Sequence, residues 1–278
     1  MLEIGKQQTL EVIRDTAPGL FLSDSEGNEI LLPGKYIPEG TKPGDLIDVF
    51  IYKDSEDRLV ATTLTPLIAL HQFAYLNVAE VNNYGAFLDW GLDKHLFVPF
   101  RGQGKKMMSG KSYLVYMYLD EQTQRLVASG KISHYVDNTQ LTVKEGEEVD
   151  IIVWEPTDIG IKVIINQKHH GLVYDNEVFT PLWPGDMRKG YIRQIREDNK
   201  IDVLMQKPGY EQIEPESQKV LDLLVSSGGT LHLHDKSEPE EIYRQLGMSK
   251  KSFKKAIGLL YRKKKIVILE DGIQLILI

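Results

Sequence analysis

The sequence predicts a mainly β protein in which three tandem five-stranded barrels are followed by an α+β C-terminal domain. Two observations carry this prediction: a strand-rich segment recurs three times along the chain, and helical periodicity begins only after the third copy. We place the barrels at residues 1–64, 65–134 and 140–208, and the C-terminal domain at residues 215–278, with a linker at Lys207–Ser217. A chain of 278 residues with 42% hydrophobic and 26% charged residues is long enough for several compact domains.

The repeat appears when the sequence is aligned with itself. GLFLSDSEGNEILLPG from Gly19 matches GAFLDWGLDKHLFVPF from Gly85, and GDLIDVFIYKDSEDRLVATT from Gly44 matches GKSYLVYMYLDEQTQRLVASGK from Gly110 at the same offset. A third, weaker copy aligns Gly160 with the first two glycines. Each copy alternates apolar and polar residues in short runs separated by turn residues, which predicts strands. Units of about five short strands are typical of small closed antiparallel barrels.

The strand GAFLD carries an aromatic ring on the face expected to contact solvent. Successive side chains of a strand point to opposite sides, so Phe87 shares its face with Asp89. An aspartate is seldom buried without a partner, which makes this face the exposed one. The equivalent residue is Phe21 in the first copy and Lys162 in the third. An exposed ring is suited to stacking on a nucleic acid base, and the alternative is that a loop or a neighbouring barrel covers it.

Other aromatic residues are expected to serve packing. Phe50, Tyr116 and Tyr191 recur at one position of the fourth strand, and we favour packing against linkers or the next barrel over ligand binding. Trp90 is in phase with the apolar residues of its strand, so we expect it in the core or at the barrel edge.

A glycine-rich loop of the second copy concentrates positive charge. Between residues 99 and 119 it has no acidic residue and four cations, namely Arg101, Lys105, Lys106 and Lys111. Cations of this kind position a phosphate backbone while rings hold the bases, so the loop is a candidate for phosphate contacts. A solvated, flexible loop is the alternative.

The second copy resembles the S-one domain, an RNA-binding OB-fold barrel, in its YGAFLDW…HLFVP and GKSYLVYMYLDEQTQRLVASGK segments. The resemblance implies a ligand face made by the ring before the glycine, Tyr84, the ring after it, Phe87, a histidine-like position and nearby cations. The first and third copies lack the ring before the glycine. At the histidine-like position two copies have proline and the third has Tyr174, and Arg125 matches the cation of the last strand. The second barrel is therefore the expected principal RNA site.

The C-terminal segment has helical periodicity. Ser237 and Glu240 have the spacing of a capping box for a helix that ends near Leu246, and Ser249 is expected to cap a helix from Lys250 to about Arg262. The chain ends in IVILEDGIQLILI, two strands around an Asp-Gly turn. This order of helix, strand, two helices and hairpin resembles a winged helix-turn-helix.

The last predicted helix has one apolar face and one basic face. Its buried stripe is expected to contain Phe253, Ala256, Ile257 and Leu260. Its solvent face contains the candidate nucleic-acid-binding residues Lys250, Lys251, Lys254, Lys255 and Arg262. In a winged helix this element enters the major groove of a duplex, and the absence of Arg, Asn and Gln from its first turns favours contacts to the phosphate backbone. Binding of a protein by this face is the alternative.

Three S-one-type barrels followed by a winged helix resemble, in order and over essentially the full chain, the conserved virulence factor B family of Gram-positive bacteria. The resemblance implies an RNA-binding regulator of gene expression, including virulence traits, without catalytic activity. We expect single-stranded RNA as the partner, and duplex nucleic acid at the winged helix as a second partner. Two alternatives stay open: a DNA-binding transcription regulator that acts through the winged helix, and a scaffold that binds proteins.

Composition limits the remaining classes. The formal net charge of −7 means that a polyanion would be bound by local basic patches. The chain has no cysteine, which excludes disulfides and thiolate chemistry and favours a cytoplasmic location. No apolar run suits a membrane span and no signal peptide is visible, so no membrane partner is expected.

Catalytic and metal-binding patterns are weak. His169 and His170, and likewise His232 and His234, lack a third ligand nearby in the sequence. No phosphate loop, paired carboxylates or Ser/His/Asp spacing is visible. We therefore expect no metal, no cofactor, no small-molecule substrate and no enzymatic activity.

Overall fold

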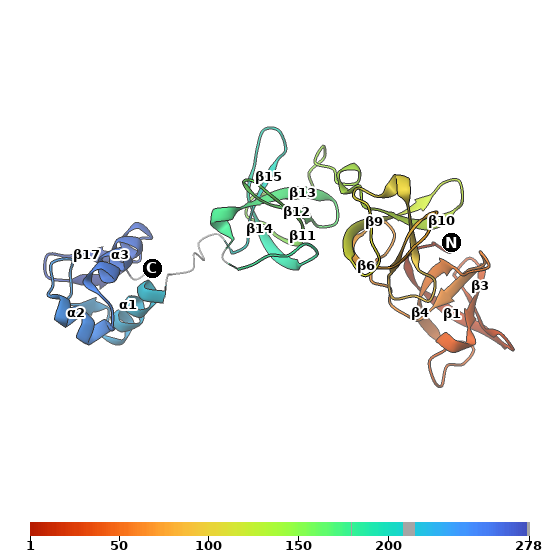
Figure 1. The fold of residues 1–278 in the computed structure, drawn as a ribbon. Helices are drawn as coiled ribbons and strands as arrows, with labels where there is room; N and C mark the ends of the chain where they lie inside the picture. Colours follow the sequence, from red (N-terminus) through yellow and green to blue (C-terminus); the bar gives the residue numbers. More distant parts are fainter. Residues whose placement is uncertain (179, 208–214, 277–278) are drawn as a thin grey trace. The chain divides into compact units, whose positions relative to one another are not determined.

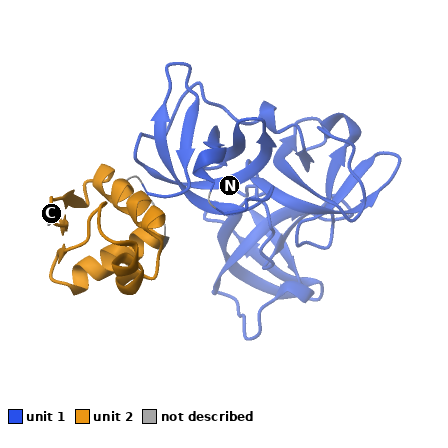
Figure 2. Ribbon diagram, turned by 60° about the vertical axis from the view of Figure 1, so that its left-hand side comes forward, with its two compact units in different colours: residues 1–208 blue, residues 209–278 orange. Residues whose placement is uncertain are grey.

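The structure is a computed structural model that describes residues 1–178, 180–207 and 215–276. The chain divides into two compact units, Met1–Pro208 and Gly209–Ile278 (Figure 2). The linker predicted at Lys207–Ser217 lies largely outside the described residues. Among the helices that the structure describes, none is long and apolar enough to cross a membrane.

The first unit contains three closed five-stranded barrels (Figure 1). The first barrel consists of β1 (Gln7–Thr16), β2 (Gly19–Ser23), β3 (Glu29–Pro33), β4 (Leu46–Lys53) and β5 (Leu59–Thr62). The second consists of β6 (Phe73–Val81), β7 (Gly85–Asp89), β8 (Leu96–Pro99), β9 (Ser112–Asp120) and β10 (Arg125–Ser129). The third consists of β11 (Glu148–Thr157), β12 (Gly160–Ile165), β13 (His169–Tyr174), β14 (Met187–Ile195) and β15 (Ile201–Leu204). In each barrel the third strand runs parallel to the fifth, and the other neighbouring strands are antiparallel.

The recurring glycine has the same structural role in all three barrels. A Cβ atom added to Gly19, Gly85 or Gly160 would lie 2.1, 2.2 and 2.2 Å from a carbonyl oxygen of the neighbouring strand. In each barrel the pairing of the first strand with the second also shifts by one residue. The shift lies directly before the residue that pairs with Phe21, Phe87 or Lys162. The repeat in the sequence therefore reflects a repeated close approach of two backbones.

Aromatic residues fill the junctions between successive barrels, as the sequence predicted for Phe50 and Tyr116, whereas the Tyr191 hydroxyl donates a hydrogen bond to Glu148 of its own barrel at 2.7 Å. Trp90 is buried, and its ring meets those of Phe50 and Tyr52 edge to face at centroid distances of 5.8 and 6.4 Å. Tyr116 stacks at 4.2 Å on Tyr135, which lies in the segment that connects the second and third barrels. These ring contacts stabilise the packing of the first unit.

The second unit has the predicted order of a winged helix-turn-helix. It consists of α1 (Pro215–Ser226), β16 (Thr230–Leu231), α2 (Pro239–Leu246), α3 (Lys250–Arg262), β17 (Ile266–Ile268) and β18 (Ile273–Leu275). The predicted stripe of α3, from Phe253 to Leu260, is buried in the core of this unit. The predicted fold of three barrels and a winged helix is confirmed.

Of the two predicted helix caps, one is confirmed and one is wrong. The Ser249 hydroxyl accepts a hydrogen bond from the Ser252 amide at 3.1 Å, as expected of an N-cap. Helix α2, however, has Glu238 as its N-cap and begins at Pro239, whose backbone angle suits the first helical position. Ser237 is buried one residue earlier, and its hydroxyl accepts a hydrogen bond from the His234 amide at 2.9 Å.

Candidate nucleic-acid interface

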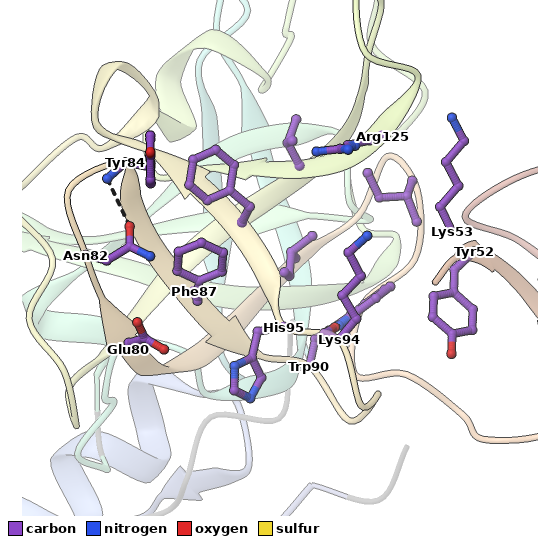
Figure 3. Close-up of a pocket in the computed structure, with 14 residues that line it drawn as sticks. Tyr52, Lys53, Glu80, Asn82, Tyr84, Phe87, Trp90, Lys94, His95 and Arg125 are labelled. Atoms are coloured by element: carbon purple, nitrogen blue, oxygen red, sulfur yellow. Dashed lines mark hydrogen bonds between the residues drawn. The ribbon is translucent and has the colours of Figure 1, made fainter. Parts of the chain in front are cut away.

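A cleft of about 600 Å³ lies on the second barrel over β7, β8 and the start of β10, and the first barrel contributes part of its wall. Its aromatic and cationic lining residues include Tyr84, Phe87, Phe97, Lys53, Lys94 and Arg125. The structure thus brings together three residues that the sequence analysis selected, namely Tyr84, Phe87 and Arg125. Figure 3 shows the Phe87 ring between Asn82 and Tyr84 on one side and Lys94 and Arg125 on the other.

Two phenylalanine rings form the floor of the cleft. Phe87 on β7 is half-buried and pairs across the sheet with Phe97 on β8, and the ring centroids are 5.1 Å apart. The sequence analysis did not select Phe97. A signal was available, because Phe97 lies between Leu96 and Val98, which are both buried, so the alternation already directs its ring to the face of Phe87.

Tyr84 stands at the rim of the cleft in the turn between β6 and β7. Its side chain is 77% exposed, and its backbone amide donates a hydrogen bond to the Asn82 side-chain oxygen at 2.9 Å. Nearby, Glu80 is an exposed acid that also lines the cleft. The rim therefore offers a third ring, held by a side-chain-capped turn, beside one negative charge.

The cations of the cleft come from two segments. Arg125 begins β10, and its guanidinium forms an ion pair with Asp57 of the first barrel. Lys94 lies in the loop between β7 and β8, where the buried Trp90 indole donates a hydrogen bond to the Lys94 carbonyl at 2.5 Å. The Lys94 ammonium donates to the Asp54 carbonyl oxygen at 2.7 Å. Burial lowers the pKa of Lys94, although Asp57 opposes this effect.

The basic loop before β9 follows a different path. Arg101 is exposed, lies 3.6 Å from Asp120 and lines a separate pocket beside Tyr118 and Tyr135. Lys105 is exposed and lies 4.0 Å from Glu155 of the third barrel. The exposed Lys106 is likewise absent from the described residues that line the cleft.

The buried side chain of Met107, whose amide donates to Gln103, fixes this loop against its barrel. The structure therefore does not bring the four loop cations, Arg101, Lys105, Lys106 and Lys111, together with Phe87 in the lining of the cleft.

In the other two barrels protein cations already contact the candidate rings. The Arg14 guanidinium lies over the Phe21 ring at 4.2 Å, and both of its terminal nitrogens donate to Glu29 at 2.8 and 2.6 Å. In the third barrel the Tyr174 hydroxyl accepts a hydrogen bond from Arg196. Neither Phe21 nor Tyr174 presents the open stacking surface that Phe87 shares with Phe97.

The exposed face of α3 carries the predicted cations Lys250, Lys251, Lys254, Lys255 and Arg262. Lys254 lies 3.7 Å from Asp235. Tyr261 is 56% exposed on the same helix, and a Cβ atom added to Gly258 would point into open space. This unit therefore has a basic helical surface.

Comparison with known proteins links both units to domain types that bind nucleic acids. The family model of the S1 domain matches residues 4–64, and that of the CvfB-like winged helix domain matches residues 218–275. The Conserved virulence factor B of Staphylococcus epidermidis is 26% identical over 97% of this chain and 93% of that protein. The resemblance to the conserved virulence factor B family is confirmed.

Two further similarities cover almost the whole chain. The Uncharacterized protein YitL of Bacillus subtilis is 25% identical over 94% of this chain and 90% of that protein. A crystal structure from Streptococcus pneumoniae, described as a multidomain protein with nucleic acid binding domains, is 24% identical, covers 98% of both chains and superposes with a TM-score of 0.44. The match to the Staphylococcus epidermidis protein, which covers 97% of this chain, spans both units.

Proposed function

We propose that the protein binds single-stranded RNA in the cleft of the second barrel. The observation that carries the proposal is the open pair of rings, Phe87 and Phe97, next to Lys94 and Arg125. Rings of this kind hold successive bases by stacking, which contributes about 1–3 kcal/mol per base and tolerates any sequence. The cations neutralise phosphates, so affinity falls as salt rises.

The biological role that we propose is post-transcriptional regulation of gene expression in the cytoplasm, including the expression of virulence traits. The names of the similar staphylococcal proteins support this role. Stacking and ion pairing hold an RNA strand without breaking a bond in it. We therefore propose a binding protein and not an enzyme.

The winged helix supports a second, assisting activity. Between Ser249 and Lys265 the chain has eight Lys/Arg residues and no acidic residue, and five of them are the cations assigned to the exposed face of α3. We propose that this face contacts the phosphate backbone of a duplex, because a basic helix of this topology fits a major groove.

The two activities are separable by binding measurements on the full chain. Fluorescence anisotropy with a labelled single-stranded RNA and a labelled duplex DNA, across about 50 to 200 mM salt, gives both affinities and their salt dependence. We expect the single-stranded RNA to bind more tightly, with an affinity that falls steeply with salt. Tighter binding of the duplex at physiological salt would favour the transcription regulator and contradict the proposal.

A further inference from the structure

The cationic end of the cleft is occupied by a carboxylate of the neighbouring barrel. Asp57 lies in the turn between β4 and β5 of the first barrel, and its Oδ2 accepts a hydrogen bond from the Arg125 guanidinium. The Lys94 ammonium lies 3.8 Å from the other oxygen, Oδ1. One carboxylate is therefore held by two cations that line the cleft.

The turn itself does not require this carboxylate. Asp54 closes the turn, because its side chain accepts hydrogen bonds from the amides of Glu56 and Arg58 at 2.9 and 3.0 Å. Asp57 has a positive φ of 62°, a conformation that Asn adopts as readily as Asp. The side chain of Asp57 thus contributes to the contact between the barrels and is dispensable for the local backbone.

The equivalent turns of the other barrels support this distinction. In the second and third barrels the residue before the strand cation also has a positive φ, of 51° at Gln124 and 60° at Asn199. All three positions share the backbone conformation, and only the first barrel places an acid there. We therefore attribute the acid at this position to the place of the turn beside the cleft, and not to the backbone conformation that the three turns share.

The pair of cations matches the chemistry of a phosphodiester. A phosphodiester carries one negative charge, as a carboxylate does, and the planar guanidinium binds either group through two parallel hydrogen bonds. Lys53 adds a third positive charge to the cleft, and Glu80 is the acid among its lining residues. The hydrogen bond from Arg125 holds the pKa of Asp57 below its ordinary value, so the carboxylate is charged at neutral pH.

We propose that Lys94 and Arg125 form a phosphate subsite of the cleft, and that the Asp57 carboxylate fills this subsite until a phosphate of the bound strand replaces it. The inference rests on the proposed function, and it adds a competitor from within the chain. RNA that reaches the subsite has to break the Asp57–Arg125 ion pair. The apolar contact of Trp90 with Phe50 and Tyr52 is separate from this pair and stays in place.

The test compares two substitutions in the same turn of the full chain. Asp57→Asn keeps the backbone conformation and removes the competing charge, whereas Glu56→Gln removes the same charge from a residue that lies 3.1 Å from Arg58. Because exposed ion pairs contribute at most about 1 kcal/mol, we expect Asp57→Asn to tighten RNA binding by about 2–5-fold. Glu56→Gln should change it much less. Equal effects of the two substitutions, or no gain from Asp57→Asn, would overturn the inference.

A double-mutant cycle with Arg125→Gln locates the effect. If Asp57 competes for Arg125, the gain from Asp57→Asn disappears when Arg125 is already Gln, so the two changes are not additive. Additive changes would overturn the inference, because they would show that Asp57 acts through the general charge of the surface. Equal unfolding midpoints of all variants ensure that the comparison is between folded proteins.

A titration with inorganic phosphate separates the inference from the proposed function. NMR signals of the Arg125 side chain report binding at the subsite without RNA. If the wild-type protein fails to bind single-stranded RNA, the proposed function fails. Whatever that outcome, the phosphate subsite and its occupation by Asp57 are supported if phosphate shifts Arg125 more strongly in Asp57→Asn than in wild type, and the inference falls if the two titrations coincide.

Discussion

The first and second barrels place a phenylalanine at the same position of the same strand, yet only one of the two rings is open. Phe21 and Phe87 each follow the recurring glycine by two residues, and each pairs with the residue after the register shift of the first strand. That partner is Arg14 in the first barrel, which covers its ring, and Glu80 in the second. The fold fixes the direction of the ring, and its neighbours decide whether the ring is available.

The residues on the third strand of each barrel add to the difference between the first and second barrels. Opposite Phe87 the second barrel has Phe97, which enlarges the stacking surface, while opposite Phe21 the first barrel has Leu31. In the third barrel the ring is replaced by Lys162, which pairs with Glu155 at 3.1 Å. One backbone thus gives a covered ring, an open pair of rings and an ion pair.

The prediction with the largest expected effect concerns the close approach of two backbones that the three barrels share. Replacing Gly19, Gly85 or Gly160 by Ala inserts a Cβ atom against a carbonyl oxygen of the next strand. We expect each change to lower the free energy of unfolding by about 2–3 kcal/mol. Chemical denaturation of the three variants measures this loss. A tolerated alanine in one barrel would show that its backbone approach differs from the others.

The next prediction concerns the difference between the first and second barrels, namely whether the ring is open to a ligand. Phe87→Ala should weaken the binding of single-stranded RNA by about 1–3 kcal/mol, because it removes a stacking platform. The matched control is Phe21→Ala, whose ring is already covered by Arg14. Anisotropy titrations should show a loss below about 0.3 kcal/mol for this control, well under the contribution of a stacked base. Equal losses for the two variants would remove the asymmetry between the barrels.

The third barrel has a half-buried histidine, His170, that makes its stability depend on pH. Burial, followed by the charges of Lys162 and His169, lowers the pKa of His170, and its Nδ1 has no hydrogen-bond partner among the described residues. In the unfolded chain this histidine takes up a proton below about pH 6.5, whereas in the folded chain it does so only at lower pH. Stability is therefore complete above the unfolded pKa and falls as the pH drops toward the folded pKa.

Chemical denaturation of wild type and His170→Gln measures this loss of stability on acidification. The two measurements are made at about pH 7.5 and 5.5, on either side of the ordinary histidine pKa. The variant should lose less stability on acidification than the wild type. An identical loss would show that His170 does not titrate differently in the folded chain.

The smallest expected effect concerns the winged helix. Gly258 lies inside α3, and a Cβ atom added there would meet no other atom within 4 Å. Gly258→Ala should therefore raise the stability of this unit by about 0.5–1 kcal/mol. Gly247→Ala is the control, because Gly247 ends α2 with a φ of 63° and should lose stability on the same change. Thermal unfolding of both variants distinguishes the expected gain in stability from the expected loss.

Strand periodicity and the internal repeat were sufficient to predict the barrels and the exposed face of Phe87, and helical periodicity was sufficient to predict the buried stripe of α3. The same alternation would have revealed Phe97 had it been applied to the next strand. The start of α2 was wrong by one residue because Pro239 determines the first helical position more strongly than the capping pattern does.

Contacts between distant parts of the chain could not be predicted from the sequence pattern. The loop of Arg101 and Lys105 is basic and close in sequence to Phe87, but the burial of Met107 fixes its path along another side of the barrel. The ion pair of Asp57 with Arg125 joins residues of two barrels, and no periodicity or motif indicates such a pair.

Photochemical crosslinking of a single-stranded RNA to the full chain, followed by mapping of the crosslinked peptides, tests the central claim most directly. The asymmetry between the barrels predicts crosslinks at Tyr84, Phe87 and Phe97, and few at Phe21. Crosslinks that concentrate on the first barrel, or only on α3, would contradict the assignment of the second barrel as the principal RNA site.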